Sequence, residues 1–430
     1  MTSPYILIPI AFLVVAFILR MPIAYGMIIG SIAYFMATGT NVGSIVHLLV
    51  NSMMNNYVLM AVPLYIFTAN VMNNGAVTDR LYGFVNSVFS KVRGSSAYVN
   101  IYGSLLFAGM TGSSVADASG LGMIEVEHMT KEGYDRGFSC ALSATSAVLG
   151  PTFPPSIIMV IFSTLSNASV GKMFMGGIIP AFLMSACLSV YVAYKAKKHN
   201  FPRGEKLSGR EFLLNTLRAI PALLTPVVLL GGIYSGTFSP TEAGAVGALY
   251  ALVISFFIYR SLNLKTLWRI LKDTARTTGN VGMIVMAAYA FSHIVAAEQL
   301  PSIIGNYIAG LTNNTNVFLM LTLLVILILG CVFDSNTIQL VFLPTIIPAA
   351  ALLGVDMVHF GVITSVAIVL GQCTPPFGVL LFITSGLSGT PLKDVTREAI
   401  PMVVCLLAAL LLITFIPDLV MWLPNMMTGG

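Results

Sequence analysis

The sequence predicts an all-α polytopic membrane protein, and three observations lead to that fold class. The chain has 430 residues, of which 57% are hydrophobic and only 37 are charged, whereas a soluble protein of this length carries roughly a hundred charges. The hydrophobic residues come in long blocks. The basic residues lie between these blocks and do not form one patch. Together these features exclude a soluble enzyme, a disordered chain and a nucleic-acid-binding protein.

Eight blocks are long enough, or nearly so, to cross a bilayer as helices, which takes roughly 20 apolar residues. They are residues 5–19, 22–38, 57–73, 173–194, 219–234, 239–259, 278–296 and 400–423. The first block has no basic start and no small-residue cleavage site, so we expect a retained helix and not a removed signal peptide. Two further blocks, 137–165 and 358–386, are expected to be broken helices, because a Pro-Pro pair interrupts each.

Segments 95–130 and 317–353 each predict a re-entrant hairpin. Each consists of an apolar leg, a polar centre and an apolar return. A leg of about 14 residues rises only about 21 Å as a helix, which is less than the roughly 30 Å of the hydrocarbon core. Such legs are expected to enter the membrane and return on the same side.

The two halves of the chain match each other. The run Gly150–Pro155 aligns with Gly371–Pro376 at an offset of 221 residues, and the same offset pairs Gly109 with Gly330, Ser114 with Ser335 and Ile179-Pro180 with Ile400-Pro401. Pro22 and Gly26 pair with Pro240 and Gly244 at an offset of 218. This predicts an internal duplication, with residues 1–218 as the first repeat, including a cytoplasmic linker 195–218, and residues 219–430 as the second.

The distribution of basic residues predicts that the repeats are inverted. Each repeat has five crossings, one of them a broken helix, and one hairpin, and an odd number of crossings turns the second copy over. Loops 260–276 and 74–94 are basic, whereas their counterparts 41–56 and 297–316 have no Lys or Arg. With the N-terminus outside, 20 of the 21 basic residues fall on the cytoplasmic side and only Lys172 falls outside. The positive-inside rule therefore places both termini on the external side.

Four irregular places are predicted at membrane depth, two in each repeat. They are the hairpin tips, residues 109–117 and 330–337, and the helix breaks, residues 150–155 and 371–376. Irregular backbone is tolerated at this depth only where it is buried in protein or lines a wet cavity. Carbonyls that lose their partners to proline, beside hydroxyls and a carboxylate, form a cage suited to a small hard cation. Half-helix N-termini at the tips can meet an anion. Such paired discontinuities indicate a transporter binding site.

The polar residues at these places admit more than one interpretation. Ser113 and Ser114 either belong to the site or hydrogen-bond their own helix, and Asn336 and Thr337 either belong to it or cap the hairpin. Asp117 is either a ligand or the cap of its return leg. Asp334 is expected to be functional, because a carboxylate between two apolar legs is expensive. Nothing in the sequence resembles a catalytic set, so we predict that the protein is not an enzyme.

Four motifs together resemble a known family. They are Gly112–Asp117 (GSSVAD), Gly133–Arg136 (GYDR), Gly150–Pro155 (GPTFPP) and Asp334–Thr337 (DSNT). The chain resembles, over its whole length, the large membrane subunit of TRAP transporters, the tripartite ATP-independent periplasmic systems with permeases of the DctM and SiaM type. It is also similar to the wider ion-transporter superfamily that includes sodium/dicarboxylate symporters.

The resemblance implies a sodium-driven, elevator-type importer of an organic acid anion in the bacterial inner membrane. The first expected substrate is sialic acid and the second is a C4-dicarboxylate. Its implied partners are a separate small four-helix membrane subunit, a periplasmic substrate-binding protein and membrane lipid. The hairpins and broken helices would move against a frame made of residues 22–38, 41–56, 239–259 and 260–276.

The resemblance also implies the ligands. Two or more sodium ions, as coupling ions, are expected at Ser113, Ser114, Gly150, Thr152, Pro154, Asp334, Ser335, Asn336, Gln372 and Thr374. The substrate is expected at Ser114, Asn336 and Thr337. Two alternatives are a standalone sodium-coupled dicarboxylate-type carrier that needs no binding protein, and a channel or scaffold, which would need a continuous polar stripe that the spans do not show.

Overall fold

The computed structural model describes residues 4–19, 21–54, 57–73, 77–204, 207–299 and 314–426, and within these ranges the chain is helical with no β-strand. The loop 297–316, which entered the charge argument, lies for most of its length outside the described residues.

The first half of the chain contains fourteen of the described helical elements. They are η1 (Pro4–Ile6), α1 (Leu7–Ile18), α2 (Ile23–Ala37), α3 (Gly43–Met54), η2 (Tyr57–Met60), α4 (Ala61–Asn73), α5 (Val77–Phe89), α6 (Ser95–Thr111), α7 (Ser114–Ser119), α8 (Leu121–Lys131), α9 (Arg136–Ser146), α10 (Leu149–Thr152), α11 (Ile157–Ser166) and α12 (Val170–Lys198).

The second half continues with the same kinds of element. They are α13 (Gly209–Tyr234), α14 (Pro240–Val253), η3 (Ile254–Ile258), α15 (Leu264–Ala297), α17 (Thr315–Gly330), α18 (Ser335–Thr337), η4 (Ile338–Phe342), α19 (Leu343–Leu352), α20 (Met357–Gly371), α21 (Val379–Ser388), α22 (Leu392–Phe415) and α23 (Asp418–Met426).

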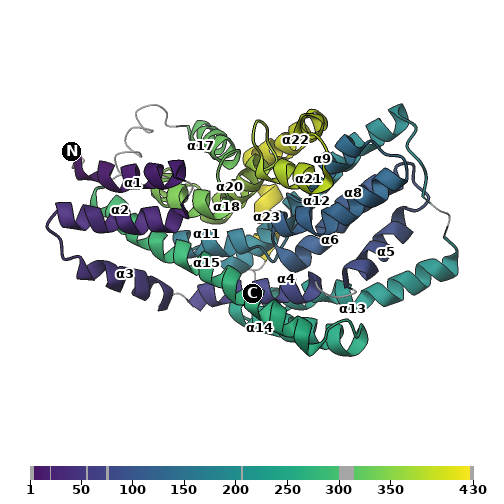
Figure 1. Cartoon of the computed structure of the whole chain (residues 1–430), viewed down its shortest axis with the longest axis horizontal. Helices are drawn as coiled ribbons and strands as arrows, with labels where there is room; N and C mark the ends of the chain where they lie inside the picture. The colour runs from purple at the N-terminus through teal and green to yellow at the C-terminus, as the bar shows by residue number, and fades with distance from the viewer. Residues whose placement is uncertain are drawn as a thin grey trace.

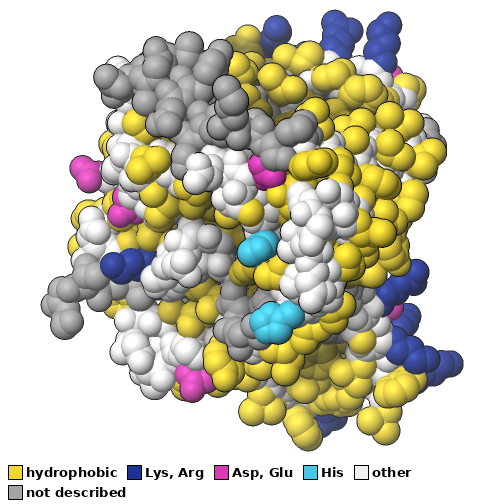
Figure 2. Space-filling model, turned by 90° about the vertical axis from the view of Figure 1, so that its left-hand side faces the viewer, with side chains coloured by type: hydrophobic (Ala, Val, Ile, Leu, Met, Phe, Trp, Pro, Cys, Tyr) yellow, Lys and Arg dark blue, Asp and Glu magenta, His cyan; other side chains and the backbone are white. Residues whose placement is uncertain are grey.

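Several helices have the length and composition of membrane spans. Among the described residues six helices qualify, or seven if the pair Arg136–Thr152 and Ile157–Ser166, bent by 44°, counts as one span. Figure 2 shows hydrophobic side chains over much of one face, with Lys and Arg side chains mostly toward its margins. This pattern fits a surface covered by lipid. The predicted fold class, an all-α polytopic membrane protein, is confirmed.

Both predicted hairpins form helical legs that turn at a polar tip. In the first, α6 leads to the tip and α7 and α8 return along it, and α6 and α8 lie side by side in Figure 1. In the second, α17 leads to the tip and α18, η4 and α19 return. The second return leg differs from the expected short one, because the π-helical turn η4 joins α18 to α19 and makes Ser335–Leu352 long enough to count among the candidate spans.

Both predicted helix breaks are present. The first helix stops at Thr152 and resumes at Ile157, and the second stops at Gly371 and resumes at Val379. The peptide bonds Pro154-Pro155 and Pro375-Pro376 are both cis. Each half therefore has the same order of hairpin, broken helix and long final helix. The repeat boundaries and the inverted orientation stay predictions.

Two polar segments, one expected to be a linker and the other a surface loop, are partly helical. The linker 195–218 narrows to residues 199–208, because α12 continues to Lys198 and a reciprocal capping box between Ser208 and Glu211 begins α13. Segment 260–276 is largely the start of α15, because the side chain of Asn263 caps that helix. Local capping thus extends both helices into regions whose composition is polar.

The core lies where the two halves pack on each other. Figure 1 shows α13 and α14 along one edge of the molecule and α17, α21 and α22 along the opposite edge, with α6, α11 and α12 between them. Helix α12 contacts α20, α22 and α23, and α9 contacts α21 and α22. The two broken helices and the two hairpins therefore share one buried centre.

Candidate functional site

The first hairpin tip rests on the helix break of its own half. Helix α6 ends at Thr111 and is capped by Gly112, whose left-handed backbone (φ 58°) suits glycine. A side chain at Gly112 would also collide with the carbonyl oxygen of Pro155. A Cβ at Gly150 would lie 3.4 Å from the carbonyl carbon of Ser113. Glycines on both sides thus allow the tip and the break to approach closely.

The second tip makes an equivalent contact with the second break. A Cβ added at Gly330 would lie 2.7 Å from the Cα of Gly371, so these backbones meet with no room for a side chain. The backbone N–H of Gly378 donates a 3.2 Å hydrogen bond to the carbonyl of Cys331. In both halves, therefore, the hairpin and the broken helix are joined at a glycine.

Each hairpin is also hydrogen-bonded to the broken helix of the other half. The Ser114 hydroxyl donates to Oε1 of Gln372 over 3.0 Å, and both side chains are buried. The Gln339 amide donates to the carbonyl of Ile158, in α11, over 2.6 Å. These two bonds link the first tip to the second break and the second hairpin to the first broken helix. The four irregular places are thereby held in one connected unit.

Some polar residues at the tips cap the helix that follows them, and others contact the opposite half of the chain. Ser113 caps α7 by accepting from the Ala116 N–H over 3.4 Å, whereas the bond that the Ser114 hydroxyl makes among the described residues goes to the opposite half. Asp334 caps α18 by accepting from the N–H groups of Asn336 and Thr337, and it also accepts from the Thr337 hydroxyl. The hairpin cap that was one alternative for this tip is therefore present, with Asp334 as its acceptor.

Several carbonyls at the breaks find replacement donors. The Ser156 hydroxyl donates to the Pro151 carbonyl over 2.5 Å. The carbonyls of Gly371 and Gln372 accept from the N–H groups of Thr374 and Leu380, each over 3.0 Å. A carbonyl oxygen has two lone pairs, so one hydrogen bond leaves it able to coordinate a cation. The protein thus supplies one hydrogen bond to each of these carbonyls, and each oxygen keeps a second lone pair that can face a cation.

The threonine hydroxyls at the breaks bond within their own helices. Thr152 donates to the Val148 carbonyl over 2.9 Å, and Thr374 donates to the Leu370 carbonyl over 2.7 Å. Of the other predicted site residues, Gly150 and Pro154 are buried, Ser335 and Asn336 are partly buried, and Asp334 is exposed. The described contacts bring Ser113 and Ser114 to Gly150 and Gln372, and they bring Asp334 to its own tip.

Two buried carboxylates lie inside the first hairpin. Both oxygens of Asp117 and both of Glu125 are buried without a hydrogen bond of standard geometry, and Asp117 has Ser104 beside it. Asp117 therefore does not cap its return leg. Glu125 lies against Gly103 of α6 and within electrostatic reach of Asp117. Sequence reasoning missed Glu125, although a carboxylate in an apolar block was a usable signal.

A network of buried amide and hydroxyl groups joins this hairpin to α9. Asn100 donates to Ser143 over 2.6 Å, and Ser146 donates to Asn100 over 2.7 Å. Ser104 donates to Ser146 over 3.2 Å. Sequence reasoning did not single out these residues. They attach the first hairpin to the broken helix through buried polar contacts, which a low local dielectric strengthens.

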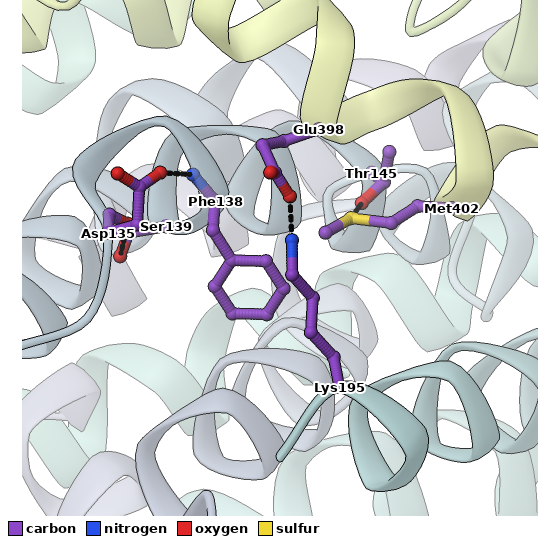
Figure 3. A network of polar contacts seen from close by, with 7 residues as sticks. All are labelled: Asp135, Phe138, Ser139, Thr145, Lys195, Glu398 and Met402. Atoms are coloured by element: carbon purple, nitrogen blue, oxygen red, sulfur yellow. Dashed lines mark hydrogen bonds and ion pairs between the residues drawn. The ribbon is translucent and has the colours of Figure 1, made fainter. Parts of the chain in front are cut away.

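A second polar network fastens the two halves together away from the tips (Figure 3). Lys195 of α12 forms an ion pair with Glu398 of α22, and its ammonium group lies 4.7 Å from the ring centre of Phe138. In the same region Thr145 donates to the sulfur of Met402 over 3.3 Å. Helices from both halves thus converge on α9.

The chain is similar to characterised transport proteins over nearly its whole length. It is 36% identical over 409 residues to the sialic acid TRAP transporter large permease protein SiaM of Vibrio cholerae, covering 95% of this chain and 96% of that protein. It is 35% identical over 370 residues to the C4-dicarboxylate TRAP transporter large permease protein DctM of Pseudomonas aeruginosa, covering 86% and 87% of the two chains.

A solved structure shares the fold. The YdaH transporter of Alcanivorax borkumensis superposes with a TM-score of 0.59 at 14% identity, covering 85% of this chain and 86% of that one. The family described as the DctM component of the tripartite ATP-independent periplasmic transporter matches residues 10–419. The expectation of a transporter permease, and not an enzyme, is confirmed. The chain belongs to the family of TRAP transporter large permeases.

Proposed function

We propose that this permease imports an organic acid anion together with sodium. Sialic acid is our first candidate substrate and a C4-dicarboxylate is the second, as in the names of the two relatives. The observation that carries the proposal is the hydrogen bond between Ser114 and Gln372, because it joins a hairpin tip to the opposite helix break at a buried point. Two irregular segments that meet in this way suit a binding site in a membrane transporter.

The oxygen atoms at the hairpin tips and helix breaks are of the kind that sodium binds. A hard cation prefers carboxylate, carbonyl and hydroxyl oxygens. One proposed cage consists of Ser113, Ser114, Gly150, Thr152 and Pro154, with Gln372 at its border. The other consists of Asp334, Ser335, Asn336, Gln372 and Thr374. Only the second contains a carboxylate, so we expect the two cages to differ in sodium affinity.

The substrate anion would bind between the tips, at Ser114, Asn336 and Thr337. Each bound sodium would add positive charge beside the substrate site and would order the hairpin tip whose residues contact the substrate. Sodium and substrate should therefore raise each other's affinity by the same factor.

An elevator movement would carry this unit across the membrane. The hairpins and broken helices, joined by the bonds of Ser114 and Gln339, would move against a frame of residues 22–38, 41–56, 239–259 and 260–276. A periplasmic binding protein would deliver the substrate, a small four-helix membrane subunit would complete the permease, and both termini would face the periplasm of a bacterial inner membrane.

Uptake into proteoliposomes tests this function. The purified permease, its small subunit and the binding protein are reconstituted, and sialic acid or a C4-dicarboxylate is supplied with an inward sodium gradient. We expect uptake that requires sodium and falls strongly in Ser114→Ala and Asp334→Ala. Wild-type rates and wild-type sodium dependence in both variants would refute the site. Uptake by the permease alone would favour the standalone carrier instead.

A further inference from the structure

The start of α15 presents a basic surface next to an apolar one. Lys265, Arg269, Lys272 and Arg276 are all exposed. At 3.6 residues per turn they lie on one stripe of the helix. The exposed side chains of Leu264, Trp268 and Leu271 form a second stripe about 100° away. The buried Ile270 and Thr274 face the protein, so both stripes face outward.

The basic stripe repels itself. Lys265 and Arg269, and likewise Lys272 and Arg276, are four residues apart, where like charges destabilise a helix. Asp273 is the one acidic residue between residues 260 and 276. Within the described part of the chain, no acidic side chain forms an ion pair with Lys265 or Lys272. A bound anion would therefore reduce the repulsion between these basic side chains.

The length of α15 predicts that the stripe reaches the level of the lipid headgroups. Helix α15 has 34 residues and rises about 51 Å, which exceeds the roughly 30 Å of the hydrocarbon core. Its apolar part, residues 278–296, is about long enough to cross that core by itself, so we expect the first turns to project beyond it. Trp268, which is exposed, is of the type that gathers at membrane interfaces.

A hollow with polar and apolar walls lies over the basic stripe and reaches Trp268 of the apolar one. Its volume is about 320 Å³, and it is lined by Lys265, Thr266, Trp268, Arg269 and Lys272. The ammonium group of Lys272 lies 5.4 Å from the ring centre of Trp268, which places a cation beside an apolar surface. This combination matches a molecule that carries both a phosphate and an acyl chain.

We propose that the first turns of α15 bind an anionic phospholipid, with its phosphate at Lys265, Arg269 and Lys272 and its acyl chain along Leu264, Trp268 and Leu271. The site is independent of the tips and breaks. The negative charge of the lipid offsets the repulsion along the stripe, and the apolar contact distinguishes a lipid from a free phosphate. The bound lipid would anchor α15, and with it the proposed frame, to the membrane surface.

Tryptophan fluorescence tests this site directly, because the chain has only two tryptophans, Trp268 and Trp422. The variant Trp422→Phe leaves Trp268 as the reporter. The full chain is placed in phosphatidylcholine vesicles, and brominated phosphatidylglycerol or brominated phosphatidylcholine is added as a quencher. We expect phosphatidylglycerol to quench Trp268 at a mole fraction at least about fivefold lower, since each basic residue favours an anionic lipid by about that factor.

Matched variants separate this site from general charge attraction. In the same background, Lys265→Gln with Lys272→Gln should strongly reduce the preference, leaving only the contribution of Arg269, whereas Lys197→Gln with Lys198→Gln, an equal loss of charge on α12, should keep it unchanged. Trp268→Phe, which leaves Trp422 as the reporter, should show no preference. Equal quenching by both lipids in the parent protein would overturn the proposal. Loss of the preference on adding inorganic phosphate, but not chloride at the same ionic strength, would also overturn it by indicating a free-anion site.

Discussion

The hydroxyl of Ser114 donates a 3.0 Å hydrogen bond to the side-chain oxygen of Gln372, which lies 258 residues further along the chain. This bond crosses from the first hairpin to the helix break in the second half. Together with the bond from Gln339 to the Ile158 carbonyl, it ties each hairpin to the opposite broken helix. Each hairpin therefore has a hydrogen-bonded contact with the other half of the chain.

Removing the Ser114 hydroxyl should slow transport. A buried hydrogen bond contributes about 1 kcal/mol, or roughly fivefold in a rate or affinity. We expect Ser114→Ala and Gln372→Ala each to reduce the initial uptake rate by at least that factor. The double variant should lose less than the product of the single effects, because both remove the same bond.

Ser119→Ala is the matched control for Ser114. Ser119 lies on the same short helix, but it is exposed, and within the described residues its hydroxyl bonds to the Val115 carbonyl of its own helix. Its uptake should remain within error of the wild type. An equal loss in Ser119→Ala and Ser114→Ala would show that the contact with Gln372 has no special role.

The glycine contact between the second tip and break predicts a steric effect. Gly371→Ala would place a methyl group against the backbone of Gly330. We expect a loss of roughly 1–3 kcal/mol in unfolding free energy, seen as a lower midpoint of thermal unfolding in detergent. Gly386→Ala, where a Cβ meets nothing within 4 Å, should leave the midpoint unchanged or raise it. Equal midpoints of thermal unfolding for Gly371→Ala and Gly386→Ala would contradict the predicted steric effect.

An engineered disulfide tests whether the hairpin unit moves past α13, which lies outside both that unit and the proposed frame. A Cβ at Gly109, on the first hairpin, would lie 3.2 Å from Cβ of Pro226 on α13, which is close to disulfide geometry. Oxidation of the double variant Gly109→Cys, Pro226→Cys should block uptake, and a reductant should restore it. Uptake that continues at the wild-type rate in a fully cross-linked protein would rule out movement of the first hairpin past α13.

A cross-link within the moving unit provides the control. The sulfur of Cys140, on α9, lies 3.2 Å from the Ser388 hydroxyl on α21. Oxidised Ser388→Cys, paired with the native Cys140, should therefore continue to transport, since both helices are proposed to move together.

The ion pair between Lys195 and Glu398 should contribute to stability. The two side chains are 14% and 27% exposed, and the cation also contacts Phe138. Glu398→Ala leaves the ammonium group of Lys195, which is mostly buried, without its partner. We therefore expect the free energy of unfolding to fall by roughly 1–3 kcal/mol, seen as a lower midpoint of thermal unfolding. Glu127→Ala breaks the exposed pair with Lys131, at 71% and 78% exposure, and should have no measurable effect. Equal midpoints for the two variants would contradict this role.

Much of the fold follows from the hydrophobic pattern and the prolines. The polar centres near Ser114 and Asp334 predicted tips, and the Pro-Pro pairs predicted breaks, because both features act locally on the backbone. Two helix starts were missed, at Gly209 and Leu264. There a single capping side chain, Ser208 or Asn263, outweighs the polar composition of the segment that follows.

The partners of the site residues could not be predicted in the same way. Spacing placed Ser114 and Gln372 in irregular segments, but the bond between them depends on how the halves pack. The same is true of Gln339, which meets Ile158 across the interface between the halves. Asp334 was expected as a ligand, and its capping of α18 follows from the turn that the tip adopts.

Direct binding of radioactive sodium to the purified full-length permease tests the central claim most closely. We expect saturable binding that is weakened at least about tenfold, roughly 1.4 kcal/mol, in Asp334→Ala and Ser114→Ala, while Ser119→Ala binds like the wild type. Wild-type sodium binding in both site variants, or no saturable sodium binding by the wild-type protein, would contradict a sodium site built from the tips and breaks.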